Sequence, residues 1–408
     1  MSTPPSIPPV SLVLLVDGLG PGLLGAGGCS WIDTPTIDHL AAQAILFENA
    51  IADSTDPETA IAAFLQGRHV WAPADPEAQP ICGQEIFSQA HSLFASDDPA
   101  IAAAAGYYGF DRVLQLPPLP GPPGESPSPR PDIGDTHLAA CFAQILSLLD
   151  SADWPLLAVV HLSSLARIWD APLSLRNRFC EDDDPLPPAC GQPPETLTTP
   201  DSPDPDEVLG LTRVLAGQIE CLDSCLGVVV DELQRQGVFQ PALIALCGLR
   251  GLAVGHHGQL GAPPGYLFSD VIDVAMLVKP PARPGWVGVR QHRLTQPSDV
   301  LDLVSQLATC ERDPGDAWPD PAPAAVVLGD GKSRAIRTPA WLLTGPTDAP
   351  GLFVKPDDRW DVNPVQDRCQ EIVGLLEQAW ERIRKTIEAP DSSATPCVLA
   401  PELVEPAP

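Results

Sequence analysis

The segment CGLRGLAVGHHG (247–258) places Arg250, His256 and His257 directly after the apolar run PALIAL. An apolar strand followed by a glycine-rich loop is typical of the carboxyl edge of a parallel sheet, where α/β proteins bind their ligands. Metal-assisted chemistry at such a place requires acids and histidines, yet this loop supplies a leucine and an arginine. Adjacent histidines in a loop diverge, so we expect His256 and His257 to be structural or solvent-facing rather than a new metal site.

Asp17 follows a second strongly apolar run, SLVLLV (11–16), and opens the glycine-rich loop DGLGPGLLGAGG. The DGLG turn lacks the GxxxxGK[ST] spacing with which a phosphate-binding loop cradles its anion. His161 lies within a third apolar run, WPLLAVVHL (154–162), and is predicted to be a hydrogen-bonded histidine of the core. Of these residues, Asp17 is the acid that stands directly at the end of a predicted strand.

Apolar residues at helical spacing predict helices between these strands. Thr34 is a candidate N-cap with Pro35 at the first helical position, and Asp56 with Pro57 repeats this plan before Gly67. Strand and helix alternate along the chain, which predicts a mostly parallel sheet covered by helices on both faces. Helices are predicted at 34–47, 56–67, 136–150 and 205–236, and a further strand at 273–279.

The last quarter of the chain departs from this alternation. Short strand candidates AAVVLG, AWLLTG and GLFVK precede the amphipathic run CQEIVGLLEQAWERIRKTI, which predicts a small antiparallel sheet with one helix. We therefore expect an α/β domain over 1–320, a small C-terminal subdomain over 321–388 and a flexible tail over 389–408. The α/β domain is expected to carry proline-rich insertions, a polyproline-like surface excursion near 116–132 and a mobile acidic segment near 181–206.

The composition predicts a soluble cytoplasmic protein that binds neither nucleic acid nor membranes. Of its 408 residues 44% are hydrophobic, which allows a large core, and a formal net charge of −30 repels nucleic acid and anionic lipids. No run approaches the roughly 20 apolar residues of a membrane span, and the first residues lack the charged region of a secretory signal. The 11 scattered cysteines form no CxxC pair, which favours reduced thiols.

Several segments, in this order along nearly the whole chain, resemble the sulfatase family of the alkaline phosphatase superfamily. TPTIDHLAAQAILFENAIA is similar to the family signature TPNLDxLAxxGxxFxNA, and SLVLLVDGLGPGLLG is similar to the opening strand and acidic metal loop. FLQGRH, GFDRVL and LFVKPDDRWDVNP resemble further family segments. The resemblance implies an alkaline-phosphatase-like, mostly parallel sheet with helices on both faces and a small C-terminal antiparallel α+β subdomain.

The resemblance also implies a divalent cation, usually calcium, held by four acid or amide side chains. Asp17 occupies the first of these positions and is the only metal ligand retained, because Gly18, Leu249 and Arg250 stand at the others that align. Leucine cannot coordinate calcium, and the charge of an arginine opposes cation binding. We therefore expect no cofactor, and a salt bridge between Arg250 and Asp17 in the old metal cavity. Calcium or another divalent cation is implied only if the protein is active.

The nucleophile position of the family is also changed. An alignment without gaps puts Pro57 there, and proline has no nucleophilic atom. A shift of two residues brings Thr55 or Thr59 to this position, and a threonine nucleophile needs metals beside it to lower its pKa. No catalytic residue is expected; Thr59 is the one candidate that stays in consideration, and an ordinary role in the first helical turn is expected for it.

Three functions remain open at this point. The first is a pseudoenzyme that has lost sulfate-ester hydrolysis and acts as a binding or regulatory protein, with a protein partner or a small anionic ligand. The second is a divergent metal-dependent hydrolase of sulfuric or phosphoric esters that uses Asp17 with Thr59, His256 or Asp53. The third is a structural protein that binds partners through its proline-rich insertions. Acids and histidines around Asp17 would favour the hydrolase, whereas Leu249 and Arg250 there would favour the pseudoenzyme.

Overall fold

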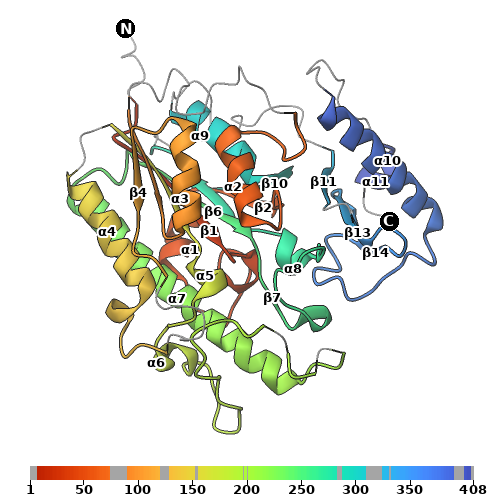
Figure 1. The fold of residues 1–408 in the computed structure, drawn as a ribbon, viewed down its shortest axis with the longest axis horizontal. Helices are drawn as coiled ribbons and strands as arrows, with labels where there is room; N and C mark the ends of the chain where they lie inside the picture. The colour runs from red at the N-terminus through yellow and green to blue at the C-terminus, as the bar shows by residue number, and fades with distance from the viewer. Residues whose placement is uncertain are drawn as a thin grey trace.

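The computed structural model describes residues 7–73, 90–119, 128–151, 155–195, 197–199, 201–282, 287–308, 324–329, 332–389 and 399–405. Its main feature is an eight-stranded sheet with the order β10-β2-β9-β6-β1-β5-β3-β4 (Figure 1). The strands are β1 (Val10–Asp17), β2 (Ile45–Ala50), β3 (His91–Ser96), β4 (Arg112–Gln115), β5 (Leu156–Leu162), β6 (Leu243–Arg250), β9 (Met276–Lys279) and β10 (Val289–Thr295). Within this sheet every pairing is parallel except those of β9 with β6 and β2.

β1 lies between β5 and β6 and is buried along its whole length. Its alternate side chains enter two different hydrophobic clusters: Leu12 and Leu14 pack on one face of the sheet, Val13 and Leu15 on the other. A strand that is apolar on both faces is typical of a parallel sheet covered on both sides. The strand predicted at 11–16 is confirmed.

Helices cover both faces of the sheet, as Figure 1 shows. One layer is formed by α1 (Pro35–Ala41), α4 (His137–Ser151) and α7 (Pro205–Arg235). The other is formed by α2 (Pro57–Gln66), α3 (Pro99–Ala105) and α9 (Val300–Ala308). The helices predicted at 56–67, 136–150 and 205–236 are confirmed within a few residues. None of the helices in the described ranges combines the length and apolar character that a bilayer crossing requires.

The helix predicted at 34–47 is only half a helix. α1 ends at Ala41, and the chain then enters β2, in which buried and more exposed residues alternate. Ala44 and Phe47 continue the helical spacing of Ile37 and Leu40, so apolar spacing alone could not separate helix from strand here. The strand predicted at 273–279 is shortened to β9, and it runs against its neighbours.

A separate four-stranded antiparallel sheet lies near the C-terminus. Its strands β11 (Val326–Gly329), β12 (Ser333–Arg337), β13 (Trp341–Pro346) and β14 (Gly351–Val354) pair in chain order. α10 (Gln370–Glu388) packs on one face through Leu376 and Trp380. The other face packs against Leu267 and Ile272 of the main domain. The predicted small antiparallel subdomain is thus present, whereas the boundary expected at 320 lies outside the described residues.

The proline-rich insertion at 181–206 is for the most part described. Arg176, at the end of α6 (Leu173–Arg176), is buried and donates from Nη1 to the carbonyl oxygens of Pro188 and Cys190 at 2.9 and 2.8 Å. A buried guanidinium needs acceptors for its donors, so these hydrogen bonds anchor a segment that was expected to be mobile.

The other two expected surface segments are described only in part. Residues 120–127 of the first insertion and 390–398 of the tail lie outside the described residues. Near the end of the tail, Leu399 and Leu403 are buried in the cluster under α10, and Leu403 lies in the short helix α11 (Pro401–Val404). Burial of these two leucines explains why this part of the expected flexible tail folds against the subdomain.

Candidate functional site

Asp17 and Arg250 form a bidentate salt bridge at the carboxyl edge of the main sheet. Arg250 Nε donates to Asp17 Oδ1 at 2.6 Å, and Nη2 donates to Oδ2 at 3.0 Å. Asp17 ends β1 and Arg250 ends β6, and a shift in the strand register at Asp17 places them opposite each other. The side chains are 2% and 15% exposed, so water screens the pair only weakly. The salt bridge predicted from the sequence is confirmed.

Arg250 also holds the loop that precedes α2. Its Nη1 donates to the carbonyl oxygen of Thr55 at 2.6 Å. The guanidinium therefore joins three segments, the ends of β1 and β6 and the loop before α2, through one planar group with its donors in a fixed fork. The guanidinium group of Arg250, rather than a metal ion, satisfies the acid and the carbonyl oxygen at this edge.

The positions next to Asp17 and Arg250 in the sequence, Gly18 and Leu249, offer no side-chain ligand for a metal. Leu249 is fully buried and packs in the hydrophobic cluster beneath α2. Gly18 has a φ of +90°, and a Cβ there would lie 3.1 Å from the backbone nitrogen of Ala166. A hard cation requires several oxygen ligands together, and both oxygens of Asp17 already accept from Arg250. Asp17, Gly18, Leu249 and Arg250 therefore do not fit a calcium site.

Thr59 lies in the first turn of α2. Its hydroxyl donates to Asp56 Oδ2, and the same oxygen accepts the Thr59 backbone N–H at 2.9 Å. Asp56 is the N-cap of the helix, and Pro57 follows it at the first helical position. These contacts give Thr59 the ordinary role in helix capping that its position predicts.

Asp53 is buried and ties the loop before α2 to the start of α9. It accepts the backbone N–H of Ser298 at 2.9 Å and also the Ser298 hydroxyl. Burial raises the pKa of Asp53 to about 8. Its two carboxylate oxygens are thus engaged within a structural contact.

His256 and His257 face different partners. His256 stacks on Trp360 with ring centroids 5.1 Å apart, and its Nδ1 lies 3.5 Å from a carboxylate oxygen of Asp270. His257 has a φ of +49° and stacks on Phe268 with ring centroids 4.2 Å apart. Burial lowers the pKa of His256, which keeps its ring neutral at pH 7. The two rings diverge as expected of adjacent loop residues.

His161 belongs to the interior of the sheet. It is fully buried in β5, and its Nδ1 lies 2.9 Å from Ser96 Oγ at the end of β3. The prediction of a hydrogen-bonded core histidine is confirmed.

Comparison with solved structures shows which fold this chain has. No protein-family model matches the sequence, and no curated protein matches it. A phosphonate monoester hydrolase of Agrobacterium radiobacter superposes with a TM-score of 0.70 at 16% identity, over 92% of this chain and 95% of that one. The chain has the sulfatase fold. Two further structures have the same fold. A phosphonate monoester hydrolase of Silicibacter pomeroyi superposes with a TM-score of 0.68 at 14% identity, over 93% of this chain and 95% of that one. A 2-O GAG sulfatase superposes with a TM-score of 0.64 at 14% identity, over 93% of this chain and 92% of that one.

Identities of this size show the fold alone, so the side chains must decide what the sulfatase fold does here. A cavity with a volume of about 300 Å³ lies between the β2–β9 part of the main sheet and the C-terminal subdomain. Four cations line it against two acids, on a chain whose net charge is −30. They are Arg290, Arg337, Lys355 and Arg359, opposed by Glu48 and Asp273.

The cations of this cavity differ in how far they are neutralised. Arg290 pairs with Glu48 at 2.6 Å. Arg337 is buried: its Nη1 donates to the Thr338 carbonyl and its Nη2 lies 3.3 Å from Asn49 Oδ1. Its Nε has no hydrogen-bond partner among the described residues. Arg337 therefore lines the cavity and retains one buried donor without a partner among the described residues.

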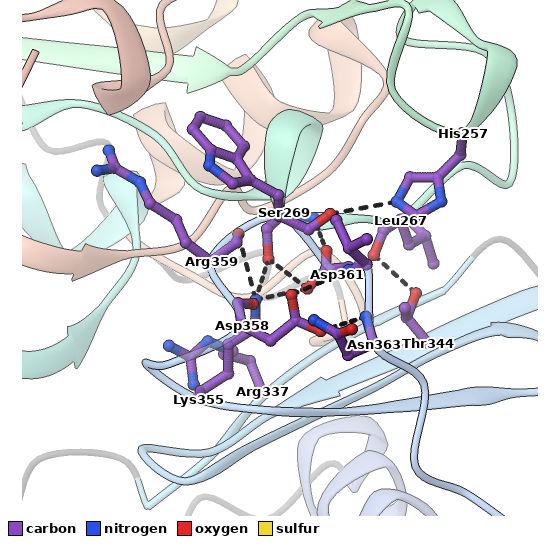
Figure 2. Close-up of polar contacts among 12 residues, drawn as sticks. His257, Leu267, Ser269, Arg337, Thr344, Lys355, Asp358, Arg359, Asp361 and Asn363 are labelled. Carbon is purple, nitrogen blue, oxygen red and sulfur yellow. Dashed lines mark hydrogen bonds and ion pairs between the residues drawn. The ribbon is translucent and has the colours of Figure 1, made fainter.

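Lys355 is held by a buried network that shapes this wall of the cavity (Figure 2). Its Nζ donates to Asp361, to Ser269 Oγ at 2.9 Å and to the Asp358 carbonyl oxygen at 2.6 Å. Asp361 also accepts the backbone N–H of Ser269 at 2.6 Å. The network fastens the loop after β14 to the main domain and so fixes Arg359 at the cavity.

Sequence reasoning missed this cavity. The one local signal was the run KPDDRWD (355–361), which packs two cations and three acids between a strand and a helix. Arg337 and Arg290 come from other strands, and only the contact between the two sheets brings them to the same place.

Proposed function

We propose that this chain is a pseudoenzyme with the sulfatase fold, in which Arg250 stands where the cation is expected and a small anion binds in the cationic cavity. The bidentate contact of Arg250 with Asp17 carries the proposal. A metal acts as a Lewis acid and generates a nucleophile from bound water or hydroxyl. A guanidinium has a fixed positive charge and no vacant coordination position, so it supports neither step.

The salt bridge also opposes the entry of a cation. A divalent ion must first displace Arg250 from Asp17, and removing one partner of a buried pair costs about 3–5 kcal/mol. Leu249 supplies no oxygen ligand in return, and Gly18 has no side chain. A hard cation would therefore meet one carboxylate where it needs several oxygens.

The cavity supports a small anion as the ligand. Arg290 pairs with Glu48 and Lys355 with Asp361, which leaves Arg337 and Arg359 against Asp273 in the lining. The buried Arg337 Nε has no partner among the described residues. A planar guanidinium matches sulfate, phosphate or carboxylate oxygens. The volume of about 300 Å³ is that of a small-molecule site. On an otherwise acidic surface, this concentration of positive charge attracts anions to one place.

Thermal melting tests both parts of the proposal. Calcium or magnesium is expected to leave the midpoint unchanged, because both Asp17 oxygens accept from Arg250 and neither Gly18 nor Leu249 adds an oxygen ligand. Inorganic sulfate or phosphate is expected to raise it beyond the rise given by chloride at equal ionic strength. Arg337→Gln should remove this additional rise, and Arg384→Gln, which breaks an exposed pair with Glu388, should keep it.

The opposite result identifies the divergent hydrolase instead. A calcium-dependent rise of several degrees that disappears in Asp17→Ala would show that Asp17 binds a cation despite Arg250. Equal rises of the melting midpoint with sulfate, phosphate and chloride would contradict the proposed binding of a small anion. Each part of the proposal therefore fails on its own readout.

A further inference from the structure

We propose that Asp97, His137 and Cys141 form a structural zinc site between β3 and α4. Asp97 follows the last residue of β3, and His137 and Cys141 lie in the first two turns of α4. Residues four apart share one face of a helix, so both can reach the same end of β3. One ligand atom from each of the three residues lies within 4.8 Å of the other two.

The spacing of the helical pair is close to that of tetrahedral zinc ligands. Cys141 Sγ lies 3.9 Å from His137 Nδ1. Zinc bonds of about 2.3 Å to sulfur and about 2.1 Å to nitrogen, at a tetrahedral angle, separate such atoms by about 3.6 Å. A contraction of about 0.3 Å therefore brings this one pair of atoms to the spacing of zinc ligands. Carboxylate, imidazole and thiolate are all ligands that zinc accepts.

The hydrogen bond of His137 leaves Nδ1 as its ligand atom. Its Nε2 lies 2.9 Å from the carbonyl oxygen of Pro117. A carbonyl only accepts, so Nε2 carries the proton and Nδ1 has the lone pair, while Cys141 Sγ lies 3.8 Å from Nε2 and 3.9 Å from Nδ1. Zinc-ligating histidines usually donate their second ring nitrogen to a carbonyl or carboxylate in this way.

Asp97 lacks a counter-charge in the part of the chain that the structure describes. Its Oδ1 accepts the backbone N–H of Ser163 at 2.8 Å, whereas Oδ2 has no hydrogen-bond partner among the described residues. Asp97 and Cys141 are 0% exposed and His137 is 6% exposed. An unpaired carboxylate is costly at such a place. Zinc with one carboxylate, one thiolate and one neutral imidazole has no net charge, which suits complete burial.

β5 places a further buried histidine next to the three ligands, because the backbone N–H of Asp97 donates to the His161 carbonyl oxygen. His161 is fully buried, and its Nε2 also has no hydrogen-bond partner within the described ranges. The Asp97 carboxylate is the nearby charge that acts most strongly on the His161 ring. The group of mutually close ligand atoms consists of the three residues Asp97, His137 and Cys141. Their burial keeps substrate away from the metal and thus favours a structural role.

Zinc binding replaces the Cys141 S–H bond by a Zn–S bond and releases the proton to solvent. Without metal, the same residues would form a neutral network in which Asp97 is protonated. Asp97→Asn separates the two accounts. The amide oxygen still accepts from Ser163 in either account, but only in the zinc account does the substitution remove a charged ligand and the bound metal.

The zinc content of the full chain, purified without chelators, tests the proposal. Elemental analysis is expected to find about one zinc per chain, and cobalt(II) exchanged into the site should give a thiolate-to-cobalt charge-transfer band. Cys141→Ala should lose both the metal and the band. Cys247→Ala, which removes an equally buried thiol on β6, should keep both.

Wild-type protein that holds no zinc after incubation with excess zinc and desalting would overturn the proposal, as would Cys141→Ala that keeps its zinc. If Cys141→Ala does not fold, two other measurements decide. The proposal predicts that Asp97→Asn loses its zinc, and that a chelator lowers the melting midpoint of the wild type. The residues differ from those around Arg250, so this result is independent of the proposed function.

Discussion

Replacing Arg250 by methionine keeps a long side chain and removes the charge that neutralises Asp17. Both Asp17 oxygens and the Thr55 carbonyl then lose the hydrogen bonds that they accept at 2.6, 3.0 and 2.6 Å. Breaking a buried pair on one side costs about 3–5 kcal/mol. Because the Arg250 side chain is 15% exposed, we expect a loss at the lower end, about 3 kcal/mol.

Thermal unfolding gives this loss a measurable size. An unfolding entropy of about 2.1 cal/mol/K per residue amounts to about 0.9 kcal/mol/K for 408 residues, so the midpoint should fall by about 3–4 °C. Arg384→Met, which breaks an exposed i,i+4 pair with Glu388, is the control and should leave the midpoint nearly unchanged.

A second substitution separates the charge from the packing. Asp17→Asn in the Arg250→Met background removes the uncompensated carboxylate, so the double variant should regain part of the lost stability. A midpoint of Arg250→Met equal to that of the wild type would refute the reasoning. So would a double variant that is less stable than Arg250→Met alone.

Three further substitutions test the surrounding structure. Gly18→Ala should lower the midpoint, because its φ of +90° and a Cβ 3.1 Å from the Ala166 nitrogen strain the turn, and an unchanged midpoint would contradict this. Asp56→Ala removes the N-cap that binds Thr59, and denaturant unfolding should show a loss of about 1 kcal/mol; no loss would mean that the cap is dispensable. Burial raises the pKa of Asp53 from 3.8 to about 8, so its contribution to stability is complete below pH 3.8 and is lost as the pH rises to about 8. Across this window the wild type should lose stability relative to Asp53→Asn by up to about 1.4 kcal/mol per pH unit, and parallel profiles would refute the assignment.

The parts of the fold that could be predicted are those in which the buried residues form a regular pattern of apolar residues in the sequence. β1 is an uninterrupted apolar run, and α2 has a cap at Asp56 and a left-handed glycine at Gly67. The prediction of one helix over 34–47 was wrong because the apolar residues of this segment satisfy both a helical and a strand pattern. Only pairing with β9 and β10 selects the strand for its second half.

Some residues of the candidate sites could likewise be predicted from the sequence, and others could not. Asp17 and Arg250 end neighbouring strands, and the carboxyl ends of parallel strands meet at one edge, so aligned positions were enough to predict their contact. The proposed zinc ligands come together only through packing of α4 against the end of β3, across a stretch that the sequence does not mark. Their one local signal was HLAAC (137–141), a histidine and a cysteine four residues apart.

Turnover of an aryl sulfate, an aryl phosphate and an aryl phosphonate monoester by the purified chain, with saturating calcium and without it, tests the central claim most directly. We predict no turnover above buffer in either condition, because Arg250 occupies the edge where a cation would act. Hydrolysis that requires calcium and disappears in Asp17→Ala would contradict the claim and show that this fold still cleaves esters.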